Sequence, residues 1–224
     1  MAILGSKTSD EKEQSKDVFH YPTSKNALII FTRNPELGKC KTRLAATVGD
    51  EKALEIYTFL VQHTATISAG VLADKFVYYS EKVHSHDLWD EAIFRKKVQR
   101  GDDLGLRMES AFKEVLSLGY ERAIIIGSDM FDINAADIND AFLALHANDF
   151  VLGPAEDGGY YLLGMKKLNP AIFKNKAWGT DSVQRDTLED LSAESLILLP
   201  EKNDVDYYED IKDVAAFQPF LKHI

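Results

Sequence analysis

The strongest constraint on the fold is an alternation of short β-rich runs with longer helical patterns between residues 26 and 200. The run "RAIIIG" is continuous and β-branched, as expected of a strand that is covered on both faces. The segment "EKALEIYTFLVQHT" is typical of a helix, with apolar residues at helical spacing: Leu54, Tyr57, Leu60 and Val61. Further helical patterns occur at 86–93, 104–119, 135–148 and 180–192. The alternation predicts a mainly parallel sheet that lies between helices.

The segment 149–165 breaks this alternation, because a polar, glycine-rich turn joins two β-rich runs without a helix. Such a connection is typical of antiparallel pairing. We therefore predict an α/β fold with a mixed, mostly parallel sheet. Residues 25–224 contain no internal repeat and no second core, so they are expected to form a single domain. Residues 1–24 are polar and aperiodic, which indicates a flexible N-terminal arm.

Composition excludes several classes of protein. The 224 residues carry a formal net charge of −10, which argues against a nucleic-acid binder because contact with phosphate backbones needs a broad basic surface. No apolar run is long enough to span a membrane, and the first residues do not read as a signal peptide. Cys40 is the only cysteine, which excludes an internal disulfide and a cysteine-based zinc site. Together these features favour a cytoplasmic protein.

This acidic chain nevertheless places four cations in one loop after its first predicted strand. The stretch "RNPELGKCKTR" contains Arg33, Lys39, Lys41 and Arg43. It is not a P-loop, because Arg33 and Cys40 stand where that motif requires Gly and Ser or Thr. Taken alone, such a loop would be a solvated basic turn. However, ligands bind at the carboxyl ends of strands in sheets of this kind, so its position favours binding of a polyphosphate, helped by the helix start behind it.

Carboxylates follow the later strands at the same edge of the predicted sheet. Asp129 comes directly after a buried strand, where a carboxylate commonly holds Mg²⁺ or Mn²⁺ and leaves positions for phosphate oxygens. We assign the metal role to Asp129 and the cap of the next helix to Asp132. Asp204 and Asp206 are two residues apart in an extended segment, so they can face one cation together. Alternatively, Asp206 caps a helix with Glu209 in a capping box.

The stretch "GPAEDGGYYLLG" contains a second candidate for ligand contact. Glycines let a ligand approach the backbone, so Gly158 and Gly159 can lie against a substrate next to Asp157. A tight turn between two strands explains the same residues equally well. In this segment the sequence leaves both interpretations open.

Two helix starts add further candidates. Trp178 can stack on a ring or cover the core, and Thr180 or Asp181 is expected to cap the helix that follows. Arg107 can reach a ligand or form a salt bridge at its own helix start. The six histidines form no compact metal-ligand pattern.

The motifs taken together resemble a known family. In order, they read "RNPELGKCKTRL", "DDLGLRM", "GSD", "GPAEDGGYYLLG", "WGT" and "DVDYYED". These resemble the landmarks of the DUF2064 group of nucleotide-diphospho-sugar transferase-like proteins, which are glycosyltransferases of the GT-A fold associated with arsenosugar biosynthesis. The chain is similar more distantly to molybdenum-cofactor and phospholactate guanylyltransferases. The resemblance implies a three-layer α/β/α, Rossmann-like GT-A fold.

The residues and the resemblance together predict a site. The predicted nucleotide- or phosphate-binding residues are Arg33, Gly38, Lys41, Thr42, Arg43 and Arg107. The predicted ligands of Mg²⁺ or Mn²⁺ are Asp129, Asp204 and Asp206. The predicted catalytic residues are Asp129 and Asp157. The predicted substrate-binding residues are Gly158, Gly159, Tyr160, Trp178 and Thr180.

The chain departs from the family pattern at four positions. Met130 and Phe131 stand where the family has a small residue and Pro, in the turn that aims Asp129. Leu106 replaces a common acidic residue, and Tyr207 replaces a common Thr. The changes after Asp129 bear most directly on metal binding and on substrate choice.

Three functions follow from this site. The leading one is a divalent-metal-dependent transfer of a sugar from a nucleotide-diphospho-sugar to a small acceptor. The second is nucleotidyl transfer of the guanylyltransferase type, in which an NTP reacts with a small phosphorylated or carboxylate substrate and releases pyrophosphate. The third is a non-catalytic nucleotide-binding domain, which the departures after Asp129 keep open. No nucleic acid or membrane partner is expected, and the sequence does not define the oligomeric state.

Overall fold

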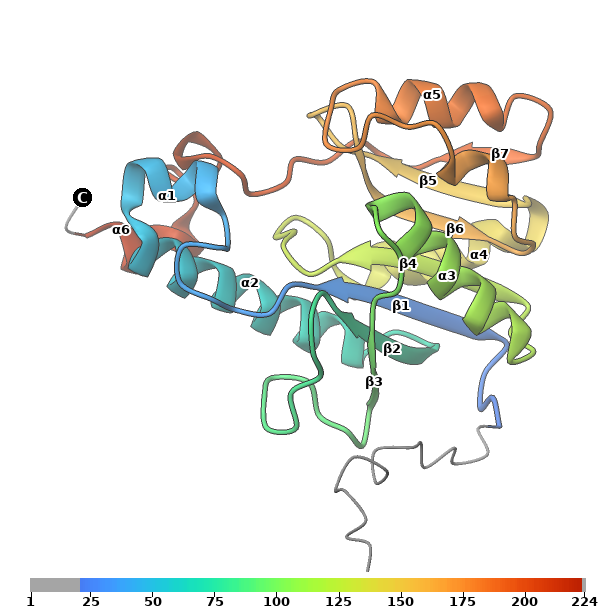
Figure 1. Ribbon diagram of the computed structural model, residues 1–224, viewed down its shortest axis with the longest axis horizontal. Helices are drawn as coiled ribbons and strands as arrows, with labels where there is room; N and C mark the ends of the chain where they lie inside the picture. The colour runs from blue at the N-terminus through green and yellow to red at the C-terminus, as the bar shows by residue number, and fades with distance from the viewer. Residues whose placement is uncertain (1–20, 223–224) are drawn as a thin grey trace, which may run out of the picture.

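The computed structural model describes residues 21–222, which form a seven-stranded sheet with helices on both faces (Figure 1). The strands are β1 (Asn26–Thr32), β2 (Asp74–Tyr79), β3 (Phe94–Val98), β4 (Arg122–Gly127), β5 (Phe150–Pro154), β6 (Tyr160–Met165) and β7 (Leu196–Leu198). The α-helices are α1 (Thr42–Val48), α2 (Asp50–Ala69), α3 (Leu104–Ser117), α4 (Ala135–Ala147), α5 (Val183–Asp190) and α6 (Gln218–Leu221). Short 3-10 helices are η2 (Pro170–Phe173), η3 (Tyr208–Asp210) and η4 (Ala215–Phe217).

The sheet is mixed and mostly parallel, as predicted. The strand order is β3-β2-β1-β4-β6-β5-β7, and β1 pairs in parallel with both β2 and β4. Strand β6 runs antiparallel to its neighbours β4 and β5. Strands β5 and β6 are the two runs joined without a helix, so the expected antiparallel pairing is confirmed. The carboxyl ends of β1 and β4 therefore lie next to each other and bring their following loops together.

Alternate residues of the strands build a core on each face of the sheet. On β1, Leu28 and Ile30 pack with residues of α2 and α4, whereas Ala27 and Ile29 pack with residues of α3. All four side chains are fully buried. This alternation is the reason why the strands read as continuous apolar runs, and it confirms the three-layer α/β/α architecture.

A third apolar cluster attaches the C-terminal segment to α1 and α2, at one end of the sheet (Figure 1). The buried side chains of this cluster are Leu44, Ile56, Leu60, Val205, Ile211 and Phe217. Because this cluster holds residues 205–217 against α1 and α2, the start of this segment lies next to the loops that follow β1 and β4. Burial in this cluster thus brings the acidic segment "DVDYYED" (204–210) to the loop that follows β1, where Asp206 contacts Lys41 and Arg43.

The prediction of a helix at 86–93 is wrong. These residues form bends and turns instead of a helix. Asp87 holds the segment in place, because its carboxylate accepts hydrogen bonds from the Tyr79 hydroxyl and from Lys96 Nζ. Trp89 is buried and packs edge-to-face on Phe94. Contacts with residues of β2 and β3 therefore override the local helical pattern.

The N-terminal arm was predicted at 1–24, and residues 1–20 lie outside the described part of the chain. Within its last residues, Thr23 N donates to Asp74 Oδ2 at 2.8 Å. Among residues 21–222, no helix combines the length and the hydrophobicity needed to cross a membrane.

Candidate active site

The basic loop between β1 and α1 contains an uncommon backbone conformation. Gly38 has a φ of 74°, which a glycine adopts at little cost. Lys41, the N-cap of α1, has φ 49° and ψ 48°, a left-handed conformation that is rare for a residue with a side chain. Such conformations are often retained at functional sites. Lys41 is therefore the residue of this loop whose backbone conformation indicates a functional role.

The Lys41 ammonium lies between two carboxylates that come from distant segments. Its Nζ is 2.9 Å from Asp129 Oδ2 and 3.0 Å from Asp206 Oδ1, and only 4% of the side chain is exposed. Arg43 Nη1 is 2.9 Å from the other oxygen of Asp206. The structure thus brings together the loop after β1, the turn after β4 and the C-terminal segment.

These contacts keep both partners charged. Burial disfavours the Lys41 ammonium, but the two carboxylates outweigh burial and raise the pKa of Lys41. Burial alone would raise the pKa of Asp129, but the charges of Lys41 and Arg33 and the hydrogen bond from Lys41 hold that pKa below its usual value. Asp129 is therefore an ionised carboxylate. Its side chain is 45% exposed.

Asp204 differs from the other two carboxylates of the predicted metal set. Burial, followed by the charges of Asp206 and Asp157, raises the pKa of Asp204 to about 6. Within residues 21–222, no three Asp, Glu, His or Cys side chains form a cluster that could hold a metal ion by themselves. Asp129 and Asp206 nevertheless fit Mg²⁺ or Mn²⁺, because they offer hard oxygen donors around a shared cation, and Mg²⁺ is typically bound by one or two carboxylates together with substrate phosphates.

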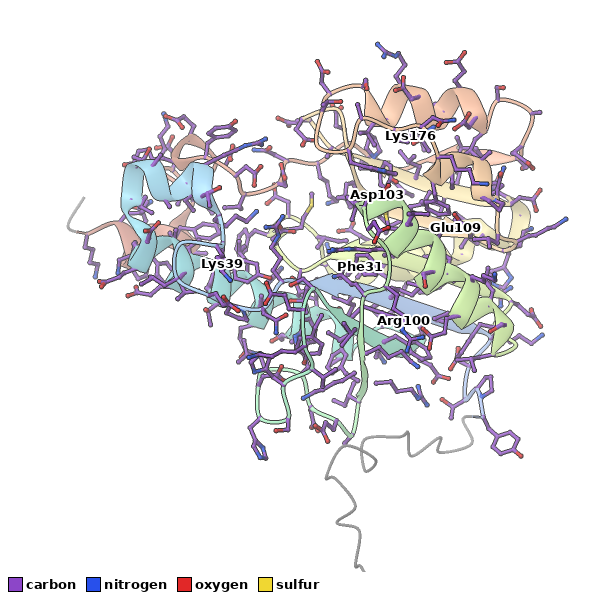
Figure 2. The ribbon with its side chains drawn as sticks, viewed as in Figure 1. Phe31, Lys39, Arg100, Asp103, Glu109 and Lys176 are labelled. Atoms are coloured by element: carbon purple, nitrogen blue, oxygen red, sulfur yellow. The ribbon has the colours of Figure 1, made fainter. Side chains whose placement is uncertain are left out.

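A cavity of about 650 Å³ opens beside these charges. The predicted site residues that line it are Arg33, Arg107, Asp129, Asp157, Gly159, Tyr160, Trp178, Thr180 and Asp204. The predicted residues outside its lining are Gly38, Lys41, Thr42, Arg43, Gly158 and Asp206. Figure 2 shows Phe31 at the sheet and Lys39 on the side of α1 and α2, and both line the cavity. Lys41, Arg43 and Asp206 join the site through their ion pairs with one another and with Asp129.

The turn between β5 and β6 has a structural reason for its glycines. Asp157 Oδ1 accepts a hydrogen bond of 2.8 Å from Gly159 N. Gly158 has a φ of 84°, and a Cβ there would lie 2.3 Å from the backbone oxygen of Asp181. Gly158 is therefore needed for a close approach between two loops, while Asp157 and Gly159 face the cavity.

Trp178 covers the start of α3 and also lines the cavity. A Cβ on Gly105 would lie 2.6 Å from the Trp178 ring, so the glycine allows this close contact. Arg107 donates from Nε to Gly101 O at 3.0 Å and from Nη1 to Gln99 Oε1 at 3.4 Å. It is therefore held by a carbonyl and an amide rather than by the salt bridge considered as its alternative.

The helix caps differ from those predicted. The cap of α4 is Asn134, in a capping box with Asp137, and not Asp132. The N-cap of α5 is Ser182 rather than Thr180 or Asp181, and it makes no capping hydrogen bond through its side chain. These differences arise because each loop continues one or two residues further before helical hydrogen bonds begin.

The capping box proposed for Asp206 and Glu209 is also wrong. Instead, Asp210 Oδ2 accepts hydrogen bonds from the backbone N–H groups of Asp206 and Tyr207. The Asp206 carboxylate is thereby left to Lys41 and Arg43.

The chain matches a known protein family over more than half of its length. A family model described as "Uncharacterized protein conserved in bacteria (DUF2064)" matches residues 63–180, which is more than half of the chain. The chain belongs to the DUF2064 family. No curated protein matches it in sequence.

Three crystal structures resemble this DUF2064 protein. One, from Desulfovibrio desulfuricans and provisionally named a nucleotide-diphospho-sugar transferase, is 31% identical with a TM-score of 0.79, covering 89% of this chain and 94% of that one. The 4-diphosphocytidyl-2C-methyl-D-erythritol synthase of Anaerococcus prevotii is 13% identical with a TM-score of 0.55, covering 86% and 95%. The Rv0371C protein of Mycobacterium tuberculosis, in complex with manganese, is 11% identical with a TM-score of 0.52, covering 89% and 99%. The last two establish similarity of fold alone.

The two unusual residues after Asp129 in this DUF2064 protein are packing residues. Met130 is 5% exposed and belongs to the core between the sheet and α2. The Phe131 ring contacts Phe59, His63 and Phe217, with a centroid distance of 4.9 Å to Phe217. Phe131 therefore anchors the turn after β4 to the cluster that holds the C-terminal segment.

A hydroxyl network that the sequence did not reveal supports both halves of the site. The Tyr57 hydroxyl accepts from Arg33 N at 2.9 Å and donates to Arg33 O at 3.1 Å. It also lies 3.3 Å from Ser128 Oγ, and Ser128 Oγ donates to Thr32 Oγ1 at 2.9 Å. Tyr57 occupies a core position of α2, so its helical periodicity indicated burial and concealed this role. In the sequence, the only sign of this network was the "GSD" motif, whose Ser128 contacts the Tyr57 hydroxyl in the structure.

The Tyr57→Phe variant is expected to weaken binding of inorganic diphosphate on the order of fivefold, because the backbone of Arg33 loses its anchor. Isothermal titration calorimetry measures this change. Tyr78→Phe is the matched control, since it removes another hydroxyl, 3.0 Å from Glu114 Oε2, outside the network. Equal affinities of the two variants for diphosphate would contradict the role of Tyr57.

Proposed function

We propose that this DUF2064 protein is a divalent-metal-dependent glycosyltransferase that moves a sugar from a nucleotide-diphospho-sugar to a small acceptor. The observation that carries the proposal is the cluster of Lys41, Arg43, Asp129 and Asp206 beside a cavity of about 650 Å³. Cations and carboxylates in contact are the groups that a metal-bridged diphosphate requires. The provisional name of the Desulfovibrio structure supports a transferase of this kind.

The phosphate end of the donor is assigned to the cations of the basic loop. Arg33 lines the cavity and its charge acts on Asp129. Among residues 21–222 the hydrogen bonds of Arg33 are made by its backbone, so its side chain is available to a phosphate. Lys41 contacts Asp129 and Asp206, and Arg43 contacts Asp206. A metal held by Asp129 and Asp206 would neutralise the charge of the leaving nucleoside diphosphate.

The acceptor end is assigned to the part of the cavity near β6 and α5. Asp157 lines the cavity and is the candidate group for orienting an acceptor hydroxyl or for removing its proton. The Trp178 ring offers an apolar surface for a sugar ring. The Tyr160 hydroxyl has a weak partner, the Met108 sulfur at 3.9 Å, so it is free to bond an oxygen of the ligand.

Nucleotidyl transfer is the second candidate, and similarity of fold to the Anaerococcus synthase favours it. In this reaction the α-phosphate of an NTP is attacked and pyrophosphate leaves. The basic loop would serve both reactions, since each has a diphosphate group as part of the leaving group.

The products distinguish the two reactions. The purified protein is first screened by thermal shift against NTPs and against UDP-, GDP-, CDP- and ADP-linked sugars with Mn²⁺, because a bound ligand raises the apparent stability. Ligands that bind are then incubated with Mn²⁺ and candidate acceptors. Release of a nucleoside diphosphate supports glycosyl transfer, and release of pyrophosphate supports nucleotidyl transfer. If no ligand shifts the unfolding temperature, the glycosyltransferase proposal is overturned.

A further inference from the structure

The buried ammonium of Lys41 occupies the centre of the charge cluster. It touches Asp129 from the turn after β4 and Asp206 from the C-terminal segment, at 2.9 and 3.0 Å. Only 4% of the Lys41 side chain is exposed, whereas 45% of Asp129 and 26% of Asp206 is accessible. The two carboxylates thus share one cation on their inner side and keep accessible surface for another.

The charges of the four ion-paired side chains balance one another. Asp129 and Asp206 contribute two negative charges, and Lys41 and Arg43 contribute two positive charges through their ion pairs with these carboxylates. A divalent ion that approaches Asp129 and Asp206 finds these two carboxylates already ion-paired and meets the ammonium of Lys41 at short range. Its binding therefore requires that the ammonium leaves or that the ligand brings further negative charge.

We propose that Lys41 is the resident cation of this site, and that a divalent metal binds Asp129 and Asp206 as the ammonium passes from these carboxylates to the phosphate oxygens of the ligand. This inference rests on the proposed function, because it assigns the same residues to a metal and to a diphosphate. It adds that Lys41 controls the metal affinity and couples it to the phosphate ligand.

The chemistry of lysine suits this exchange. Its ammonium is a compact charge on a flexible four-carbon stem, so it can change partners while the backbone stays in place. Arg43 is less suited, because its side chain is 52% exposed and contacts one carboxylate of the pair. When the ammonium moves to a phosphate, Asp129 and Asp206 recover two uncompensated negative charges for the metal. Metal and phosphate must then bind with positive coupling, and the coupling is reciprocal.

The direct test measures binding of Mn²⁺ alone to the full chain, from the electron paramagnetic resonance signal of the free ion. Lys41→Met is expected to bind Mn²⁺ on the order of tenfold more tightly than the wild type, because the competing ammonium is gone. Lys52→Met is the matched control: its ammonium pairs with Glu55 on α2, neither residue lines the cavity, and its Mn²⁺ affinity should equal that of the wild type. In a Lys41→Met/Asp129→Asn double variant the gain should disappear. An unchanged or weaker Mn²⁺ affinity of folded Lys41→Met overturns the proposal.

A second measurement uses the wild type and does not depend on how well the variant folds. Thermal unfolding is followed with Mn²⁺ alone, with inorganic diphosphate alone and with both. The expected result is a small shift with each and, with both, a shift larger than the sum. Additive shifts, or a full shift with Mn²⁺ alone, overturn the proposal.

The two proposals fail separately. Release of nucleoside diphosphate from a sugar donor, together with unchanged Mn²⁺ affinity of Lys41→Met, would leave the glycosyltransferase standing and remove the cation exchange. Tighter Mn²⁺ binding by Lys41→Met without use of any donor would do the reverse.

Discussion

Asp129→Asn is expected to reduce turnover about a hundredfold or more, because the amide keeps the shape of the side chain but loses the charge that a metal requires. Asparagine can still accept a hydrogen bond from Lys41, whose ammonium also keeps Asp206 at 3.0 Å. The fold should therefore survive, and the loss should appear in kcat and in the concentration of Mn²⁺ needed for half-maximal rate. Steady-state kinetics over a series of Mn²⁺ concentrations measures both.

Asp132→Asn is the control for this result. Asp132 lies in the same turn, but the contact that the structure gives it is through its backbone oxygen, which accepts from Lys202 Nζ at 2.7 Å. Its side chain can change without effect on that bond, so the rate should stay within about twofold of the wild type. Metal-dependent turnover that persists unchanged in Asp129→Asn would show that Asp129 is not a metal ligand.

Arg43→Ala is expected to lower kcat/KM on the order of a hundredfold, whereas Lys39→Ala should lower it less than about threefold. The two side chains make a matched pair, since they are 52% and 62% exposed and each holds one ion pair. Losses of folding stability should be small and similar, because exposed ion pairs contribute little. The difference comes from the partners: Arg43 is bound to Asp206 of the site, and Lys39 is bound to Glu36 of its own loop.

The measurement is the kcat/KM of both variants with the donor identified by the screen, together with their unfolding temperatures. Lys39 lines the cavity, so the comparison tests whether proximity alone is sufficient for a role. Equal losses of kcat/KM in the two variants would indicate that the loop acts only as a general positive surface.

Local patterns predicted the elements whose burial is regular. The continuous apolar run at β4 and the helical spacing in α2 were assigned correctly because one face, or both, is covered along the whole element. The prediction at 86–93 was wrong because Asp87 and Trp89 are held by residues of β2 and β3, and no local spacing encodes such contacts.

The candidate site divides in the same way. The sequence alone indicated a basic loop after the first strand and acidic motifs after later ones, because motif chemistry and strand position can be read along the chain. Only the tertiary structure determined which cation pairs with which carboxylate. Lys41 meets Asp129 and Asp206, which are 88 and 165 residues away, because apolar burial around Phe217 folds the C-terminal segment against α1 and α2. Contacts over such separations depend on packing rather than local propensity, so the sequence determined the components of the site and the tertiary structure determined their pairing.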